Sequence, residues 1–392
     1  MNSSDYFKQK KNIQLIVQTT LDCNLRCKHC YEGSLEYPKQ TISLEKVEQL
    51  IKLAQSAYHR VDYLWFGGEP LIAGLDFFRS VVDLQNEHKQ NCQIHNSVQT
   101  NGVLIDQEWI DFFKLNKFDI SISFDAQFND VLRQDTNKVI EAINLCKSNH
   151  INVTTISTIT SQSCDYQFEM YEYLKNEGLL GKFNRIFSEG SAKKNSEYLI
   201  EDQHYINSMK TFFSKWIFDS DAQKNSSIDI CLRSLFNFDS KECIYSGCLF
   251  KWLAVAPNGD IYPCPRFSGT NMKLGNVMQI RDINGVFFSD AYKSILEDNL
   301  ERIKKCQKTC LLFPYCHSGC NARSYWSGDI TQPSVDICSY VKEFFPYVVK
   351  TIMEIVNSDQ RELLNPYMKA LYNQKQENFL DTFEYFKENH LI

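Results

Sequence analysis

Eleven of the fifteen cysteines in this 392-residue chain fall into two clusters, and no other feature constrains the fold as strongly. The first cluster is Cys23-x3-Cys27-x2-Cys30, which follows an apolar run at Ile13–Val17. Three thiolates on one short loop suit a cubane iron–sulfur cluster, which takes four ligands. One iron is then open to an outside molecule, which favours chemistry at the cluster over electron transfer. Zinc is the alternative, because Cys-x2-Cys is also a zinc spacing.

The second cluster lies between residues 243 and 338. Eight thiolates are enough for two fully ligated cubanes, and the alternative is a pair of structural zinc sites. The eight are Cys243, Cys248, Cys264, Cys306, Cys310, Cys316, Cys320 and Cys338. The four remaining thiols are expected to be small buried hydrophobes: Cys92, Cys146, Cys164 and Cys231.

Composition excludes several classes of protein. With 43% hydrophobic and 23% charged residues, the chain is typical of a globular protein of two or three domains. A net charge of −6 gives no support for nucleic-acid binding, and no apolar run is long enough to span a membrane. The N-terminus lacks a signal-peptide pattern. So many cysteines without an export signal indicate the reducing cytoplasm, where thiols bind metals rather than form disulfides.

Strand-like and helix-like segments alternate in the first part of the chain. Strands are expected at Ile13–Thr19, Val61–Phe66, Gln93–Thr100, Phe118–Phe124, Val153–Ile159 and Asn184–Phe187. Helices are expected at Leu44–Ser56, Gly74–Lys89, Gln107–Leu115, Lys138–Asn149 and Phe168–Glu177. This alternation predicts an α/β fold with a parallel sheet and right-handed crossovers. Six βα units form only a partial (β/α)6 TIM-like barrel, with functional residues at the C-terminal ends of its strands.

Candidate residues do follow the expected strands. The cysteine triplet follows the first strand, Gly67-Gly68-Glu69-Pro70 the second, Ser97–Asn101 the third and Ser123 the fourth. The two glycines permit a close approach of the backbone, which suits contact with a cationic amino group near Glu69. The alternative for this segment is an ordinary turn.

Arg133 lies in the loop after the fourth strand, where its guanidinium could bind a carboxylate through two parallel hydrogen bonds. The alternatives are a solvated surface arginine here and a plain strand-end hydroxyl at Ser123.

The cysteine triplet followed by the aromatic Tyr31 closely resembles the signature of the radical S-adenosylmethionine (SAM) superfamily. The resemblance implies that the triplet holds a SAM-binding [4Fe–4S] cluster. It also implies that the segment from Gly67 to Pro70 contacts the methionine amino group of SAM. Further SAM-binding residues implied by the resemblance are Tyr31, Gln99, Ser123 and Arg133, the last on the methionine carboxylate.

The second cysteine cluster resembles the SPASM extension of radical SAM enzymes, which holds two interleaved auxiliary [4Fe–4S] clusters. By this resemblance the nearer cluster has the ligands Cys243, Cys248, Cys264 and Cys320, and the farther one Cys306, Cys310, Cys316 and Cys338. One departure is the Cys306–Cys310 gap of three residues, where the family usually has two. The implied organisation is a radical SAM partial barrel at 13–235, a small cysteine-rich SPASM domain at 236–345 and a C-terminal helical extension at 346–392. The cofactors are then three [4Fe–4S] clusters and SAM.

Within that group, the segments Trp65–Leu71, Ser97–Asp106 and Gly259–Cys264 look most like the anaerobic sulfatase-maturating enzymes, which oxidise a Cys or Ser of a client peptide to formylglycine. Two departures count against this activity. Phe66 stands where that family has Gln, and Pro265-Arg266 stands where it has the Asp that acts as general base. The reaction needs a base to take the thiol or hydroxyl proton. Neither Pro265 nor Arg266 can act as that base.

The expected function is therefore an oxidoreductase that uses a 5′-deoxyadenosyl radical to modify a peptide. We expect a thioether or carbon–carbon crosslink in a ribosomally synthesised peptide. A formylglycine-generating maturase is the first alternative, and a non-catalytic zinc or electron-transfer protein is the second.

The expected partners are a peptide or protein substrate and an electron donor such as flavodoxin or ferredoxin, with no nucleic acid and no membrane. About a dozen residues precede the first expected strand, so a leader peptide would need a separate binding protein or another surface. The amphipathic segments Phe344–Ile355 and Leu363–Tyr372 are candidates for such a surface, and the alternative is that they pack on the core.

Overall fold

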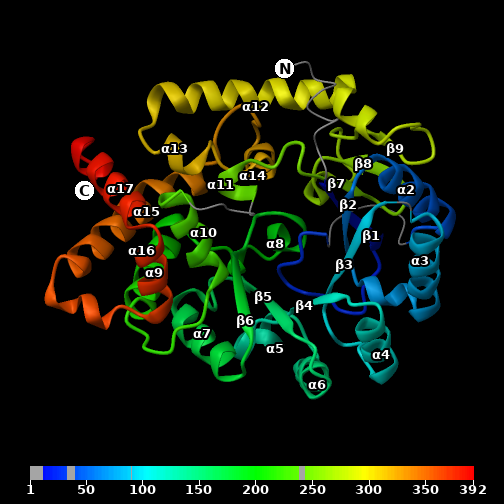
Figure 1. Ribbon diagram of the computed structural model, residues 1–392, viewed down its shortest axis with the longest axis horizontal. Coiled ribbons are helices and arrows are strands. Elements are labelled where there is room, and N and C mark those ends of the chain that lie inside the picture. The colour runs from blue at the N-terminus through cyan, green and yellow to red at the C-terminus, as the bar shows by residue number, and fades with distance from the viewer. Residues whose placement is uncertain (1–11, 33–39, 90, 238–242) are drawn as a thin grey trace.

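The computed structural model describes residues 12–32, 40–89, 91–237 and 243–392, except for the side chain of Ser246. In this part of the chain, nine strands form one sheet in the order β6-β5-β4-β3-β2-β1-β7-β8-β9 (Figure 1). The strands are β1 (Asn12–Thr20), β2 (Arg60–Gly67), β3 (Gln93–Thr100), β4 (Asp119–Ser123), β5 (Val153–Ile159), β6 (Leu180–Arg185), β7 (Trp252–Val255), β8 (Asp260–Tyr262) and β9 (Gly275–Asn276).

The first six strands are parallel, and each pairs with the next in the chain. The helices between them lie along the outer side of the sheet (Figure 1). They are α2 (Leu44–Ala57), α3 (Leu75–Glu87), α4 (Gln107–Leu115), α6 (Thr136–Ser148) and α7 (Gln167–Asn176). The short α5 (Asn129–Leu132) instead bonds to the loop that follows β1. The predicted α/β fold with six parallel strands is confirmed.

Alternating burial explains why these segments form strands. In β1 the side chains of Leu15 and Val17 are fully buried, and in β2 the rings of Tyr63 and Trp65 stack inside the core. Apolar residues on one face of each helix cover the sheet, which is how an amphipathic helix buries its apolar stripe. The start of α4 is capped by Asp106, whose side chain accepts a hydrogen bond from a backbone N–H in the first turn.

The sixth strand differs from its prediction. The expected strand was Asn184–Phe187, whereas β6 runs from Leu180 to Arg185. Its second residue is Gly181, where a Cβ would lie 2.8 Å from Leu174 of α7. The segment Leu180–Arg185 lacks the β-branched residues that usually indicate a strand. It forms one because Gly181 lets α7 pack closely on it.

The C-terminal half adds three short strands to the same sheet. Strand β7 pairs parallel to β1, and β8 and β9 continue antiparallel. The remaining helices are α8 (Gly190–Lys194), α9 (Asp202–Trp216), α10 (Ser226–Leu235), α11 (Cys243–Ser246), α12 (Asp290–Thr309), α13 (Phe313–Cys316), α14 (Asn321–Trp326), α15 (Val335–Val356), α16 (Pro366–Gln374) and α17 (Gln376–Glu388). The domain bounds stay a prediction, and α15 crosses the expected boundary at residue 345.

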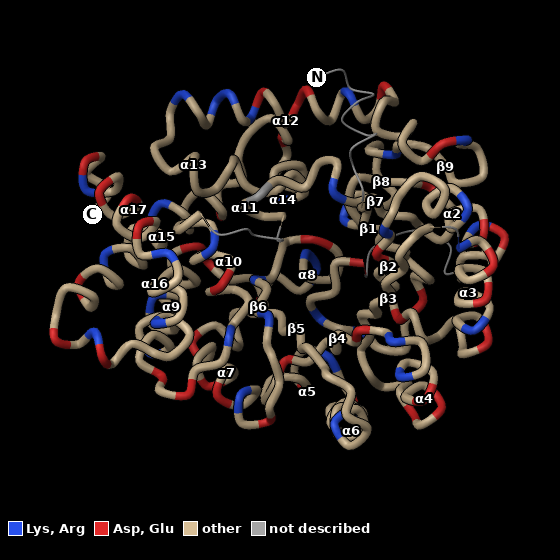
Figure 2. Tube along the Cα trace, viewed as in Figure 1, with Lys and Arg blue, Asp and Glu red and all other residues tan. Residues whose placement is uncertain are grey.

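Both amphipathic C-terminal segments pack on the rest of the fold. Helix α15 packs along α9, with Phe344 fully buried between Phe213 and Tyr340. Met368 and Leu371 of α16 are likewise buried. Lys and Arg alternate with Asp and Glu along the helices (Figure 2). Among the described helices, none is both long and apolar enough to cross a membrane.

Candidate cluster and SAM site

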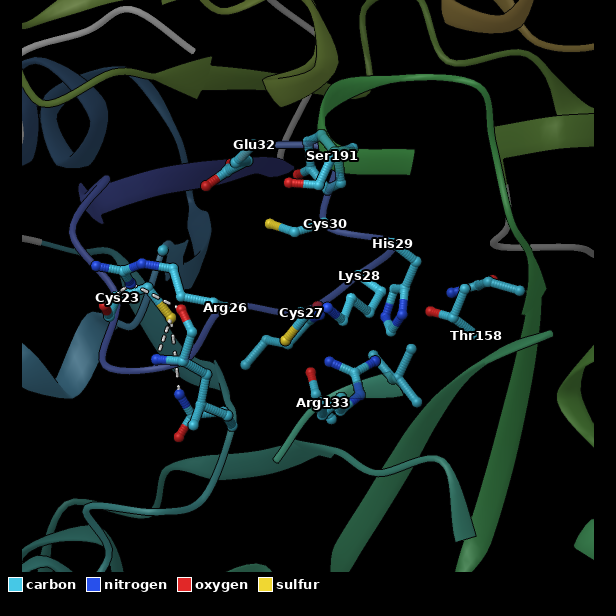
Figure 3. Close-up of a pocket in the computed structure, with 18 of the residues that line it drawn as sticks. Cys23, Arg26, Cys27, Lys28, His29, Cys30, Glu32, Arg133, Thr158 and Ser191 are labelled. Carbon is cyan, nitrogen blue, oxygen red and sulfur yellow. Dashed lines mark hydrogen bonds between the residues drawn. The ribbon is translucent and has the colours of Figure 1, made fainter. Parts of the chain in front are cut away.

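The cysteine triplet lies on the loop that follows β1. The pairing of β1 with β2 shifts register between Gln18 and Thr20, and such an irregularity redirects the strand end. The side chain of Asn101, at the end of β3, donates hydrogen bonds to Asn24 Oδ1 at 2.8 Å and to Cys23 Sγ at 3.9 Å. Figure 3 shows Cys23, Cys27 and Cys30 around one space, with Arg133 beside Cys27.

Two other segments anchor this loop through its backbone. The Lys28 N–H donates to the Leu132 carbonyl at 3.0 Å, and the Ser191 N–H donates to the Cys30 carbonyl at 2.8 Å. The second contact depends on Gly190, which has a φ of +56° and approaches so closely that a Cβ would lie 2.3 Å from the Tyr31 carbonyl oxygen. The loop is therefore held through its backbone by both segments.

The glycine pair after β2 also makes a close approach. A Cβ on Gly67 would lie 2.2 Å from the Thr20 carbonyl oxygen, and one on Gly68 would lie 2.2 Å from that of Asp22. The Gly68 and Glu69 amides donate to these same two carbonyls at 2.8 Å. This segment is thus bonded to the cysteine loop rather than forming an isolated turn.

Glu69 is fully buried and does not line the cavity, and neither does Pro70. Its carboxylate accepts hydrogen bonds from the backbone amides of Leu71 and Asn101 and from the Thr100 hydroxyl. Burial raises the pKa of Glu69 to about 7, and these donors oppose the shift. Its contact with the methionine amino group of SAM stays a prediction, while its role in joining the ends of β2 and β3 is visible.

Arg133 is not a surface arginine. Its side chain is 10% exposed, and its Nε donates to Asp125 Oδ2 at 2.7 Å. Burial disfavours the cation, but Asp125 and Cys27 outweigh that effect and raise the pKa of Arg133. Arg133, Ser123 and Gln99 all line the same cavity as the cysteine loop.

This cavity has a volume of about 410 Å³. Burial raises the pKa of Cys23 to about 11 and that of Cys30 to about 12. These thiols therefore stay protonated until a metal ion binds sulfur and displaces the proton. The other polar groups in the wall include Glu32, whose Oε1 accepts a hydrogen bond from Gln18 at 2.7 Å. Burial raises the pKa of Glu32 to about 7.

An aromatic and cationic wall closes another part of the cavity. The Arg266 guanidinium lies 4.6 Å from the ring centres of both Tyr31 and Phe187, and it donates to Glu189 Oε2 at 2.6 Å. Phe66 stacks on Tyr31 with ring centres 6.2 Å apart. Burial disfavours the cation, but the Glu189 carboxylate outweighs this and raises the pKa of Arg266.

The cysteines of the second cluster gather in two groups. Electrostatic interactions join Cys248 and Cys264 to Cys320, and α11 begins at Cys243. The other group shares mutual interactions of the same kind and consists of Cys306, Cys310, Cys316 and Cys338. The three cysteines of the first group and the four of the second fall within the two sets implied by the resemblance. The roles of all eight cysteines as ligands stay a prediction.

The clustered thiols of the described residues are not spaced for a single zinc ion. Thiolates around one zinc ion, with bonds of about 2.3 Å, lie about 3.8 Å apart. Over the residues that the structure describes, no three of the eleven clustered thiols lie within 4.8 Å of one another. The sets are therefore wider than a single ion requires. The four thiols outside the clusters are buried, as expected.

Comparison with protein families agrees with this geometry. Residues 17–162 match the model of the radical SAM superfamily, and residues 243–311 match SPASM, an iron–sulfur cluster-binding domain. The chain belongs to the radical SAM superfamily and carries a SPASM domain. This radical SAM chain is therefore an enzyme with SAM and iron–sulfur clusters as cofactors.

Its relatives include a cysteine-type anaerobic sulfatase-maturating enzyme of Clostridium perfringens, 27% identical over 88% of this chain and 98% of that protein. A serine-type enzyme of Bacteroides thetaiotaomicron is 26% identical over 65% of this chain and 69% of the relative. A solved structure of anSMEcpe with bound AdoMet superposes with a TM-score of 0.78 at 26% identity, covering 88% of this chain and 99% of that one. Streptococcus suis SuiB, at 18% identity and a TM-score of 0.62 over 84% of this chain and 77% of its own, shares the fold.

Sequence reasoning missed several residues of this radical SAM site. Glu189 and Gly190 follow β6, so the rule that sites lie at strand ends could have found them. Glu32 comes directly after the aromatic of the cysteine motif. The link between Arg266 and Glu189 joins segments far apart in the chain, and nothing in the local sequence indicates it.

Proposed function

We propose that this radical SAM enzyme modifies a peptide and closes a thioether or carbon–carbon crosslink in it. The observation that carries the proposal is one cavity lined both by the loop from Cys23 to Cys30 and by Arg266, two residues after Cys264. A client side chain held there lies beside the SAM-binding loop and beside the nearer auxiliary cysteines. Binding of the Cp18Cys peptide by anSMEcpe supports a peptide as the client class.

When bound, the reduced cluster and SAM supply a 5′-deoxyadenosyl radical that abstracts a hydrogen atom. The chain's own residues orient the reactants around it. Arg133 is fixed by Asp125 to receive a carboxylate, and the Tyr31–Phe66 stack excludes water from one wall. The proposed cofactor set is three [4Fe–4S] clusters: one SAM-binding cluster on the triplet and two auxiliary clusters on the interleaved sets.

Pro265 and Arg266, the two residues after Cys264, support a crosslink rather than formylglycine. Pro265 begins a short 3₁₀ turn after Cys264 and has no titratable group. Arg266 stays protonated beside Glu189. Neither can take a proton from a client thiol or hydroxyl.

Formylglycine formation is the second candidate, and two observations favour it. The likeness to the sulfatase-maturating enzymes covers most of the chain, and Glu32 brings a carboxyl group to the cavity. If this candidate is right, Glu32 is the base that replaces the missing Asp.

A peptide assay separates the two candidates. The enzyme is incubated without oxygen with dithionite, SAM and a Cys-containing sulfatase peptide, and aldehyde is captured with a hydrazine probe. We expect 5′-deoxyadenosine and no aldehyde. A peptide encoded beside the gene should instead lose two hydrogens per crosslink, in a form that resists thiol alkylation if the bond is a thioether.

An aldehyde that forms with the wild type but not with Glu32→Gln would overturn the crosslink proposal in favour of formylglycine. Failure to form 5′-deoxyadenosine in any of these mixtures would contradict both candidates.

A further inference from the structure

Arg302 on α12 is completely buried, one helical turn before Cys306. Its guanidinium donates to Ser318 Oγ at 3.5 Å, to the Ile330 carbonyl oxygen at 2.7 Å and to Asn321 Oδ1. All three acceptors are neutral. Within the described residues, no carboxylate forms an ion pair with this arginine.

A buried cation needs a counter-charge, because the cost of burying an unpaired charge is large. The titratable groups near Arg302 are cysteines. They are Cys320, Cys248 and Cys306. Cysteine ligands of an iron–sulfur cluster are thiolates, so the cluster-loaded protein supplies the counter-charge that Arg302 needs.

Asn321 connects the arginine to one of these sulfurs. It is 4% exposed, and its Oδ1 accepts hydrogen bonds from Arg302 and from Asn299. Its Nδ2 donates to Cys248 Sγ at 3.3 Å. Two donors on the oxygen polarise the amide and strengthen the N–H that it offers to the sulfur.

We propose that Arg302, acting directly and through Asn321, raises the reduction potential of the nearer auxiliary cluster. Reduction adds an electron to a group that is already negative, and a fixed neighbouring cation stabilises the reduced form. Hydrogen bonds to ligand sulfurs act in the same direction and are a known determinant of cluster potential. The inference rests on the ligand sets of the proposed function. It makes the nearer auxiliary cluster a better electron acceptor than the same cluster would be without Arg302.

The test is a redox titration followed by electron paramagnetic resonance. Replacing Cys23, Cys27 and Cys30 by Ala removes the signal of the first cluster and leaves the auxiliary ones. In this background Arg302→Gln should reduce the equilibrium constant for one-electron reduction about tenfold, which lowers the potential by about 59 mV. Asn321→Leu should lower the same potential, because it removes the donor to Cys248. Arg302→Lys keeps the charge and should retain most of the wild-type potential.

The matched control is Arg233→Gln, which removes one positive charge from an arginine paired with Asp229 at 2.8 Å. It should leave every potential unchanged. Loss of about four irons in Arg302→Gln but not in Arg302→Lys would also support the counter-charge role.

Full iron with unchanged potentials in Arg302→Gln and Asn321→Leu would overturn the inference. An equal fall in Arg302→Gln and Arg302→Lys, or loss of iron from both with the helical signal intact, would overturn it too. A wild-type protein with iron for the first cluster alone would contradict the proposed cofactor set instead, so the two failures are distinguishable.

Discussion

At the scale of single residues, Gly190 shows how the site depends on the backbone. A Cβ there would lie 2.3 Å from the Tyr31 carbonyl oxygen, whereas Gly178, at a similar φ of +65°, has nothing within 4 Å of a Cβ. At both positions a change to Ala costs about 1–2 kcal/mol of backbone strain, because φ is positive. Gly190→Ala must in addition displace the loop of Cys30. We expect Gly190→Ala to lower the free energy of unfolding in urea by about 2 kcal/mol more than Gly178→Ala and to reduce bound iron. Equal effects of the two substitutions would contradict the close approach.

Glu32 supplies a residue-scale prediction about pH. Burial raises its pKa from 4.5 to about 7 in the folded chain. The folded state therefore holds this proton more tightly, so the stabilisation is complete below pH 4.5 and is lost as the pH rises through 7. A pKa change of this size corresponds to about 3 kcal/mol.

We expect Glu32→Gln to abolish this fall in the free energy of unfolding at rising pH, because Gln does not titrate. Urea unfolding of cluster-free protein at pH 4.5 and pH 7.5 gives the change in the free energy of unfolding between the two pH values. This change is then compared between the wild type and the variant. The same pH dependence in both proteins would show that Glu32 does not titrate in this range.

At the scale of elements, α15 tests whether the C-terminal helices belong to the core. Phe344 is fully buried against α9, whereas Val335, at the start of the same helix, is 70% exposed. Phe344→Ala should lower the free energy of unfolding by about 3–5 kcal/mol, because it leaves a cavity. Val335→Ala should change it by less than about 0.5 kcal/mol. Chemical denaturation followed by circular dichroism measures both, and a small effect of Phe344→Ala would favour a docking role for α15.

At the scale of the whole molecule, the cysteine sets predict the iron content. The anaerobically reconstituted enzyme should bind about twelve irons, four for each of three cubanes. Changing Cys23, Cys27 and Cys30 together to Ala should remove about four irons and abolish SAM cleavage.

Changing Cys306, Cys310 and Cys316 to Ala should also remove about four irons, but 5′-deoxyadenosine should still form, because SAM binds at the first cluster. Iron analysis and chromatography of the products measure both effects. Stoichiometric zinc without a brown chromophore would contradict the iron–sulfur assignment.

The sequence by itself determined the family, the parallel α/β sheet and the grouping of the cysteines. Each depends on a local signal: ligand spacing within one loop, or apolar periodicity within one segment. The same signals predicted the bounds of α4 and β3. They failed at β6, which begins at Leu180 and has Gly181 as its second residue, where Leu174 of α7 packs closely.

Only the tertiary structure decided which charged groups meet. It paired Arg266 with Glu189 and Arg133 with Asp125, and it left Arg302 among cysteines instead of carboxylates. It also extended the sheet from β1 into β7, across more than two hundred residues of chain. Burial and charge pairing depend on which segments come together after folding, and no spacing within one segment records that.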